Sequence, residues 1–214
     1  MIRPFFYTIL FLIILTGAII FGYYVYNRWY GSEQNPPETK ERTVEEEKGY
    51  AYPVENFKEN QTKKVFGQYI TRENSPIQPE RFSGYHTGVD VEVNPEDIDK
   101  GIPVYAISDG IIRSVQDDIY GYGGIIVIEH LIDNQTMTAI YGHIKYFSVE
   151  KEAGDLVAKG EQIAILGADK SLETDDERKH LHFGIHKGSE IDIRGYVQNK
   201  SELSEWCDPN SIYE

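Results

Sequence analysis

Histidines and an aspartate recur in three short segments whose side chains have the chemistry of a metal site. Residues 180–183 read His-Leu-His-Phe, and because side chains alternate along a β-strand, the two histidines would share one face. Residues 86–90 and 141–143 add two further imidazoles and a carboxylate. Histidine and carboxylate groups are the ligands of catalytic zinc, which usually keeps three protein ligands and one open position.

The residues available for such a zinc site are His86, Asp90 and one histidine of the pair His180 and His182. Zinc lowers the pKa of a bound water to about 7, so hydroxide would be available at neutral pH. The other histidine of the pair and His143 have unperturbed pKa values near neutrality, so they can move protons or donate hydrogen bonds to a developing oxyanion. The sequence contains no His-Glu-x-x-His motif, which excludes the thermolysin-type arrangement.

Two histidines are predicted to lie outside this site. A histidine taken alone is ordinarily a structural or solvated residue, so only the combination of segments points to chemistry. His130 ends an apolar strand without an acidic or imidazole neighbour at ligand spacing, and we expect a structural role for it. His186 shares the face of His182, but four residues of strand separate them by about 13 Å, which is too far for one metal ion.

Composition narrows the class of protein. A chain of 214 residues can form one well-buried domain with appendages. The net charge of -14 argues against a nucleic-acid partner, because phosphate binding needs a basic surface. Cys207 is the only cysteine, which excludes an internal disulfide and a cysteine-rich metal site.

The N-terminal residues are predicted to anchor the chain in a lipid bilayer. Residues 4–27 carry no charge, and about 20 apolar residues cross a bilayer as a helix. A cleaved signal peptide, the alternative, has an apolar core of only about 7 to 15 residues, so we expect residues 1–30 to form an uncleaved transmembrane helix. Residues 31–49 contain adjacent prolines and three consecutive glutamates, which predicts a flexible acidic stalk, with a short charged helix as the alternative.

From residue 50 onward the sequence predicts an all-β domain made mainly of antiparallel sheet. Residues 103–107 and 111–115 flank Asp109-Gly110, a dipeptide that favours a hairpin turn. Residues 125–128 are a β-branched run, expected to be buried on both faces and to pair with residues 136–144.

Glycines mark two further features of this domain. Residues 162–166 read Gln-Ile-Ala-Ile-Leu and lie between Gly160 and Gly167, which predicts another strand. Residues 121–124 read Gly-Tyr-Gly-Gly, but a strand follows where a phosphate-binding loop needs a helix, so we expect a loop at the rim of a cleft.

A set of short segments, each weak alone, is specific when taken in order. The set comprises residues 86–90, 101–106, 109–110, 121–123, 141–143, 157–160 and 180–183. It resembles the pattern of the M23 peptidases, the lysostaphin/LytM-type zinc endopeptidases that cleave the peptides of bacterial peptidoglycan. The resemblance covers about residues 65–188.

The resemblance implies His86, Asp90 and His182 as zinc ligands, with His143 and His180 as the catalytic pair. It implies a central antiparallel sheet with a groove across it. The implied activity is hydrolysis of peptide bonds in peptidoglycan stems or cross-bridges by a zinc-bound water that the two histidines assist. Zinc is then the cofactor and a peptidoglycan peptide the substrate.

Because that substrate lies outside the cytoplasmic membrane, the resemblance also implies the orientation of the chain. The peptidase domain, residues 50–190, is expected outside the cytoplasm, on a single-pass protein of the cytoplasmic (inner) membrane. The count of basic residues points the other way, since Arg28, Lys40 and Arg42 follow the apolar run and only Arg3 precedes it. Long following domains are translocated largely regardless of such charges.

Two segments depart from the family pattern. The polar insert, residues 169–179, is predicted to form a loop beside the groove that alters substrate choice. Residues 191–214 are predicted to be a C-terminal appendage. We expect neither segment to touch the five site residues.

Two other functions deserve comparison with the enzyme. Some relatives have lost ligands and act as non-catalytic regulators that bind and activate another cell-wall hydrolase, but all five positions are intact here. Residues 157–161 resemble part of a lipoyl- or biotin-carrier hairpin, yet such carriers present a modifiable lysine at a tight turn. The comparable region here is a long acidic insert followed by two histidines. The complete set of residues favours the enzyme.

The predicted anchor and orientation have a direct test. Protease added to intact spheroplasts is expected to remove the domain of residues 50–190 while residues 1–30 stay with the membrane. Protection of the domain until the spheroplasts are lysed would reverse the predicted orientation.

Overall fold

The computed structural model describes residues 49–214, whose regular elements are β-strands and 3-10 helices. The predicted transmembrane helix and nearly all of the predicted stalk lie outside the described residues. Among residues 49–214, no helix is long and apolar enough to cross a bilayer.

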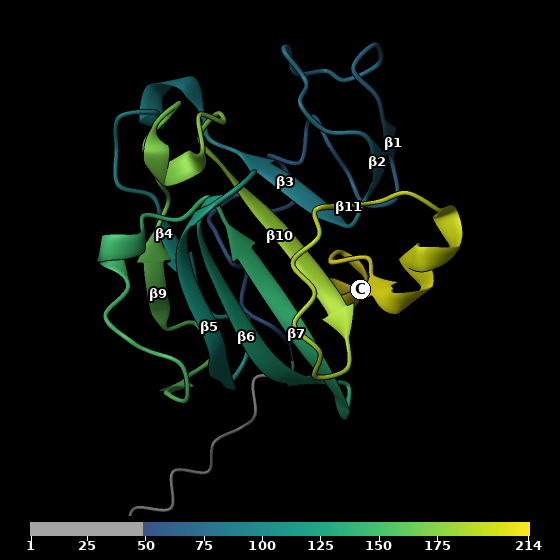
Figure 1. The fold of residues 1–214 in the computed structure, drawn as a ribbon. Helices are drawn as coiled ribbons and strands as arrows, with labels where there is room; N and C mark the ends of the chain where they lie inside the picture. The colour runs from purple at the N-terminus through teal and green to yellow at the C-terminus, as the bar shows by residue number, and fades with distance from the viewer. Residues whose placement is uncertain (1–48) are drawn as a thin grey trace, which may run out of the picture. The chain divides into compact units, whose positions relative to one another are not determined.

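Twelve strands are formed by residues 49–214, and their pairings are antiparallel, as the sequence predicts (Figure 1). The strands are β1 (Tyr69–Ile70), β2 (Gly84–His86), β3 (Gly88–Glu92), β4 (Pro103–Tyr105), β5 (Gly110–Ile119), β6 (Gly123–Ile132), β7 (Gln135–Gly142), β8 (Leu156–Val157), β9 (Gln162–Ile165), β10 (His180–Lys187), β11 (Tyr196–Val197) and β12 (Trp206–Cys207). The 3-10 helices are η2 (Pro95–Asp97), η3 (Tyr146–Ser148), η4 (Leu172–Thr174), η5 (Lys200–Glu205) and η6 (Ser211–Tyr213).

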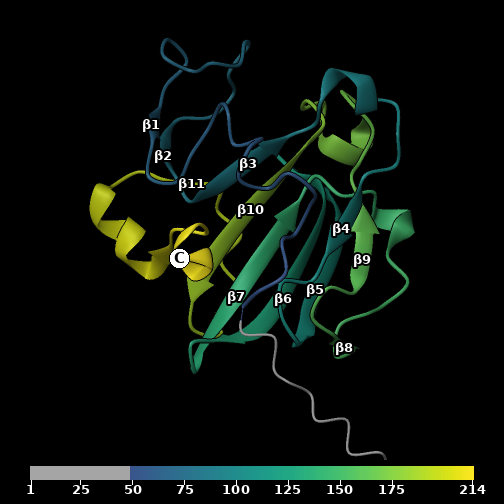
Figure 2. The ribbon, with the colours of Figure 1, turned by 180° about the vertical axis from the view of Figure 1, so that it is seen from behind.

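The main sheet has the strand order β12-β10-β7-β6-β5-β8, with β3 also paired to β10. Smaller sheets are formed by β1-β2-β11 and by β4-β9. Figures 1 and 2 show β10 between β3 and β7, with the β4-β9 pair beside the β5 end of the sheet. The strand that carries the histidine pair, β10, thus pairs with three others, β3, β7 and β12.

Alternation along the central strands divides the side chains between the two faces of the sheet. On β10, Leu181, Phe183 and Ile185 enter the larger core, which also contains Ile126 and Ile128 of β6. The opposite face has its own apolar cluster, made of Tyr122, Ile125, Val127, Ile140 and Trp206. The run of residues 125–128 is therefore buried on both faces, as predicted.

The predicted β6-β7 hairpin is confirmed. Asp133 and Asn134 form the turn with φ angles of 49° and 61°, and Ile132 pairs with Gln135. The strand expected at residues 162–166 is also present as β9. Short polar turn residues tolerate this left-handed conformation, which is why the hairpin could be predicted locally.

The hairpin predicted at Asp109-Gly110 is wrong. Strand β4 pairs with β9, and β5 pairs with β6 and β8. Gly110 is the first residue of β5, and a Cβ at this position would be 2.5 Å from the Glu129 carbonyl oxygen and 2.6 Å from His130 Nδ1. Glycine is required here for close packing of two strands rather than for a turn.

His130 forms a hydrogen-bond network at the place where β5 and β6 approach each other closely. Its Nδ1 lies 3.1 Å from the Asp109 carbonyl oxygen, and its Nε2 lies 3.2 Å from the Tyr141 hydroxyl. The Ile107 amide donates to the same hydroxyl at 3.2 Å. This buried network gives His130 the structural role that the sequence predicts.

The C-terminal segment, residues 191–214, is built into the sheets. Strand β11 pairs with β2, and β12 pairs with β10. Trp206 is buried and covers the face of the main sheet on which the histidines lie. This segment therefore takes part in forming the surroundings of the candidate site.

Substitution of Gly110 tests the reason given for this residue. Gly110→Ala is expected to lower the free energy of unfolding by about 1 to 3 kcal/mol, because the added methyl group meets backbone atoms that cannot move freely. Gly101→Ala is the matched control, since its Cβ would meet only the Ile165 side chain, at ordinary contact distances of 3.5 Å to Cγ2 and 3.8 Å to Cδ1. Urea unfolding of both variants gives the comparison, and equal stability would contradict the close-packing explanation.

Candidate metal centre

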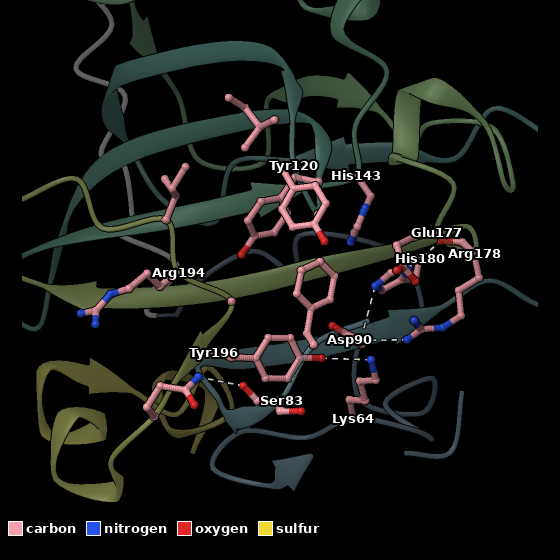
Figure 3. Close-up of a pocket in the computed structure, with 17 residues that line it drawn as sticks. Lys64, Ser83, Asp90, Tyr120, His143, Glu177, Arg178, His180, Arg194 and Tyr196 are labelled. Carbon is pink, nitrogen blue, oxygen red and sulfur yellow. Dashed lines mark hydrogen bonds and ion pairs between the residues drawn. The ribbon is translucent and has the colours of Figure 1, made fainter. Parts of the chain in front are cut away.

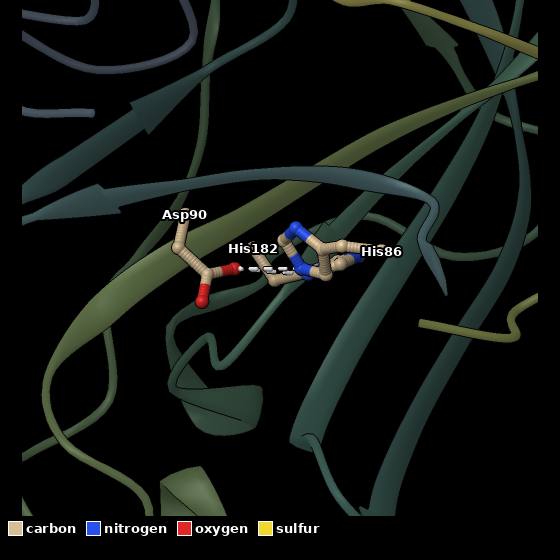
Figure 4. A group of neighbouring side chains, drawn as sticks. All are labelled: His86, Asp90 and His182. Carbon is tan, nitrogen blue, oxygen red and sulfur yellow. Dashed lines mark hydrogen bonds and ion pairs between the residues drawn. The ribbon is translucent and has the colours of Figure 1, made fainter. Parts of the chain in front are cut away.

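The side chains of His86, Asp90 and His182 place atoms that can bind a metal ion close together (Figure 4). His86 Nε2 lies 3.2 Å from Asp90 Oδ1, His182 Nδ1 lies 3.1 Å from the same oxygen, and the two nitrogens are 3.1 Å apart. Bonds of about 2.0 to 2.1 Å to a tetrahedral zinc ion would separate its ligand atoms by about 3.4 Å. The triangle therefore has the size and chemistry of a zinc ligand set.

The strand pairing brings these ligands together. In the β3-β10 register, Asp90 lies opposite His182, and His86 is the last residue of β2, just before β3 begins. The His86 Nδ1 lies 3.3 Å from the Val65 carbonyl oxygen. A proton held on Nδ1 by that carbonyl leaves the Nε2 lone pair directed at the other two ligands.

Burial and the neighbouring side chains together set the protonation states of the cluster. Burial lowers the pKa of His182 to about 4, so its imidazole is neutral and available as a ligand at neutral pH. Burial alone would raise the pKa of Asp90, but the neighbouring His180 and His86 hold it well below its usual range. A carboxylate and neutral imidazoles are the protonation states that metal binding requires.

The two histidines expected to act in catalysis lie together beside this cluster. The ring centroids of His143 and His180 are 4.2 Å apart. The Nδ1 of His180 lies 2.8 Å from the Arg178 carbonyl oxygen, and its Nε2 lies 3.4 Å from Asp90 Oδ2. The Nδ1 of His143 is buried without a hydrogen-bond partner among residues 49–214.

Tyr141 and His143 do not share a face, although simple strand alternation would put residues two apart on the same side of the sheet. Tyr141 lies in the larger core against Phe183, whereas His143 lies beside His180 on the opposite side of the sheet. The backbone of His143 adopts the left-handed φ of 62° just after β7 ends. This conformation is uncommon for a residue other than glycine and interrupts the alternation of the strand.

A pocket of about 290 Å³ opens over Asp90, His143 and His180 (Figure 3). Its walls include four aromatic side chains, Phe82, Tyr120, Tyr122 and Tyr196. Phe82 stacks on Tyr196 at 5.9 Å between ring centroids and meets Tyr120 edge-on at 5.5 Å. Tyr120 and Tyr122 belong to the glycine-rich turn between β5 and β6, which the sequence predicts at the rim of a cleft.

The expectation that neither divergent segment touches the five site residues is wrong. Arg178 of the polar insert binds Asp90 Oδ2 at 2.8 Å, and Tyr196 of the C-terminal segment packs on His86 at 5.1 Å between ring centroids. Lys64 donates to the Tyr196 hydroxyl at 3.0 Å and pairs with buried Glu80 at 2.7 Å.

The sequence contains an indication that Arg178 lies on the same face as the histidine pair. It lies two residues before His180, so continuing the strand alternation by one step would have indicated the same face. Nothing in the local sequence around Lys64 or Tyr196 indicates their positions, because each depends on contacts between distant segments.

The remaining histidine, His186, lies away from the ligand cluster. It is on β10, where it contacts Trp206 at 5.0 Å between ring centroids. It is not among the residues whose ligand atoms converge. This position agrees with the prediction that His186 is too distant to share a metal ion with His182.

An antiparallel sheet that carries a buried His-Asp-His cluster, with two more histidines in the adjoining pocket, has the features of a metallopeptidase domain. Residues 84–193 match the peptidase family M23, and the chain belongs to this family. The catalytic domain of the antimicrobial peptidase lysostaphin from Staphylococcus simulans is 26% identical, with a TM-score of 0.45 over 69% of this chain and 86% of that domain.

Two curated relatives match part of the chain. A lipoprotein NlpD/LppB homolog from Pseudomonas aeruginosa is 32% identical over 101 residues, or 47% of this chain. An uncharacterized metalloprotease from Haemophilus influenzae is 33% identical over 125 residues, or 56% of this chain. The matched regions span 31% and 23% of the lengths of these relatives.

The ligand assignment can be tested by metal analysis. His86→Ala, Asp90→Ala and His182→Ala are each expected to abolish stoichiometric zinc binding, because each removes one of three protein ligands. His186→Ala is the control from the same face of β10, and it is expected to keep zinc. If His182→Ala kept full zinc while His180→Ala lost it, the assignment within the pair would be inverted.

Proposed function

We propose that this protein is a membrane-anchored zinc endopeptidase that hydrolyses peptide bonds in peptidoglycan stems or cross-bridges. The observation that carries the proposal is the convergence of His86, Asp90 and His182 beside two further histidines in one pocket. Membership of family M23 supports a peptidoglycan peptide as the substrate. The anchor of residues 1–30 and a location outside the cytoplasm are part of the proposal.

Zinc suits this ligand set better than a harder cation does. Two imidazoles and one carboxylate oxygen form a three-ligand set of the catalytic zinc type, whereas calcium and magnesium prefer all-oxygen sites. A zinc ion held by His86, Asp90 and His182 would supply Lewis acidity and would lower the pKa of a water molecule.

His180 is proposed as the general base. His180 Nδ1–H donates a hydrogen bond to the Arg178 carbonyl oxygen, which leaves the lone pair on Nε2 in the neutral ring. When Nε2 takes a proton, the Asp90 carboxylate 3.4 Å away stabilises the resulting imidazolium. The same nitrogen can then deliver the proton to the leaving amine.

His143 is proposed to stabilise the developing oxyanion. Burial and the nearby His180 hold the pKa of His143 well below its usual range, so the ring stays neutral and keeps one N–H to donate. Its Nδ1 has no hydrogen-bond partner within residues 49–214. The left-handed backbone that aims this ring at the pocket is the kind of strain that accumulates at functional sites.

A non-catalytic regulator that activates another cell-wall hydrolase is the alternative function. Loss of ligands would favour it, and all five residues are present in this chain. Hydrolysis by the purified protein decides between the two functions. Full-length protein loaded with zinc is incubated with purified peptidoglycan of several cross-link types, and mass analysis of the fragments identifies the bond that is cut.

Substitution of His143 and His180, the two site histidines that are not proposed as metal ligands, tests the mechanism. His143→Ala and His180→Ala are each expected to lower the turnover rate by about 10²-fold or more while zinc remains bound, as loss of an oxyanion donor or a general base commonly does. His186→Ala, a buried histidine outside the pocket, is the control and is expected to keep both zinc and activity. Activity within a few fold of the parent for both zinc-loaded variants would contradict these roles.

A further inference from the structure

Arg178 is buried against the metal ligand Asp90. Its side chain is 11% exposed, and Nη2 lies 2.8 Å from Asp90 Oδ2. The same guanidinium binds Glu92, with Nε 3.0 Å from both carboxylate oxygens and Nη2 2.6 Å from Oε1. Figure 3 shows Arg178 beside Asp90 and His180 at one end of the pocket.

We propose that Arg178 is a positioning residue that holds Asp90 as a one-oxygen metal ligand, an inference that rests on the zinc site of the proposed function. Asp90 Oδ1 faces His86 and His182, whereas Oδ2 faces Arg178 at 2.8 Å and, at the longer distance of 3.4 Å, His180 Nε2. A carboxylate left to itself can rotate or offer both oxygens to a metal. A charged hydrogen bond to Oδ2 removes that freedom and directs Oδ1 alone at the ligand triangle.

Glu92 allows a cation to lie so close to a metal site. An arginine alone would repel a metal ion bound to Asp90, since both carry positive charge. Glu92 takes the Nε edge of the guanidinium and offsets its charge, and Lys63, 38% exposed, contacts the other side of Glu92 at 3.0 Å. The Arg178-Glu92 pair therefore presents a hydrogen-bond donor to Asp90 with little net charge.

The alternative role for Arg178 is to attach the polar insert to β3. The C-terminal end of the insert is already held beside β3 without Arg178, because the insert runs directly into β10. Strand β10 pairs with β3 over five register positions, from His180 opposite Glu92 to Gly184 opposite Gly88. Arg81 attaches the insert independently, with ion pairs of 2.9 Å to Asp175 and to Glu177. Arg81 makes no contact with Asp90, so it provides a matched control for a purely structural effect.

The test measures zinc affinity of the full-length protein by competition with a chromophoric chelator. Arg178→Gln is expected to weaken zinc binding by about 10- to 100-fold, as loss of a partner of a metal ligand commonly does. Arg178→Lys is expected to lose less zinc affinity than Arg178→Gln, because lysine keeps the positive charge. Some loss is still expected, since lysine cannot bind Asp90 and Glu92 through a rigid fork. Arg81→Gln is expected to change the affinity by less than about threefold, since its ion pairs are partly exposed.

Cobalt substitution gives a second measurement that a structural role would not affect. The visible spectrum of bound Co²⁺ reports its coordination number, and Arg178→Gln is expected to shift the spectrum toward higher coordination as Asp90 offers its second oxygen. Arg81→Gln is expected to leave the spectrum unchanged. Circular dichroism and thermal unfolding establish that each variant is folded.

The outcomes separate this inference from the proposed function. Wild-type protein that binds no zinc would overturn both. Zinc binding by the wild type with equal affinity in Arg178→Gln, or an equal loss in Arg81→Gln, would overturn only the role of Arg178. Wild-type protein that binds zinc tightly but cuts no peptidoglycan would overturn the proposed activity, and the affinity series would still decide the role of Arg178.

Discussion

The antiparallel pairing of β3 with β10 is the constraint on which the site depends. It sets Asp90 opposite His182 and Glu92 opposite His180. The two backbones come so close at Gly88 that a Cβ would lie 2.4 Å from the Phe183 carbonyl oxygen. A slip of one residue would turn every side chain of β10 to the other face of the sheet. The apolar core and the ligand cluster are therefore specified by the same backbone contacts.

Much of this arrangement could be predicted because it follows from strand alternation. The pattern of residues 180–183 separates two histidines from Leu181 and Phe183, and the structure buries those two apolar side chains in the larger core. Alternation alone could not decide which histidine of the pair belongs to the ligand cluster. The resemblance to family M23 implied His182, and its Nδ1 is the nitrogen that lies with His86 and Asp90.

The features that could not be predicted depend on contacts between segments far apart in the sequence. Asp109-Gly110 has the composition of a turn, but its glycine is explained by the packing of β5 against β6. The position of His143 depends on its own left-handed backbone conformation, which the alternation of side chains along a strand does not predict. Lys64 meets Tyr196 across 132 residues of sequence, and local patterns carry no information about such a pair.

Two aromatic residues of the pocket wall lie outside the part of the sequence that supplies the metal ligands. Phe82 and Tyr196 stack on each other, yet one precedes and the other follows the region 84–193 that matches the family. The ligand atoms of the metal cluster all come from inside that region. Mutations in the flanking segments can therefore reshape what the pocket accepts while the strands that hold the ligands stay unchanged. The sequence of this part of the pocket wall can therefore change independently of the residues that form the ligand cluster.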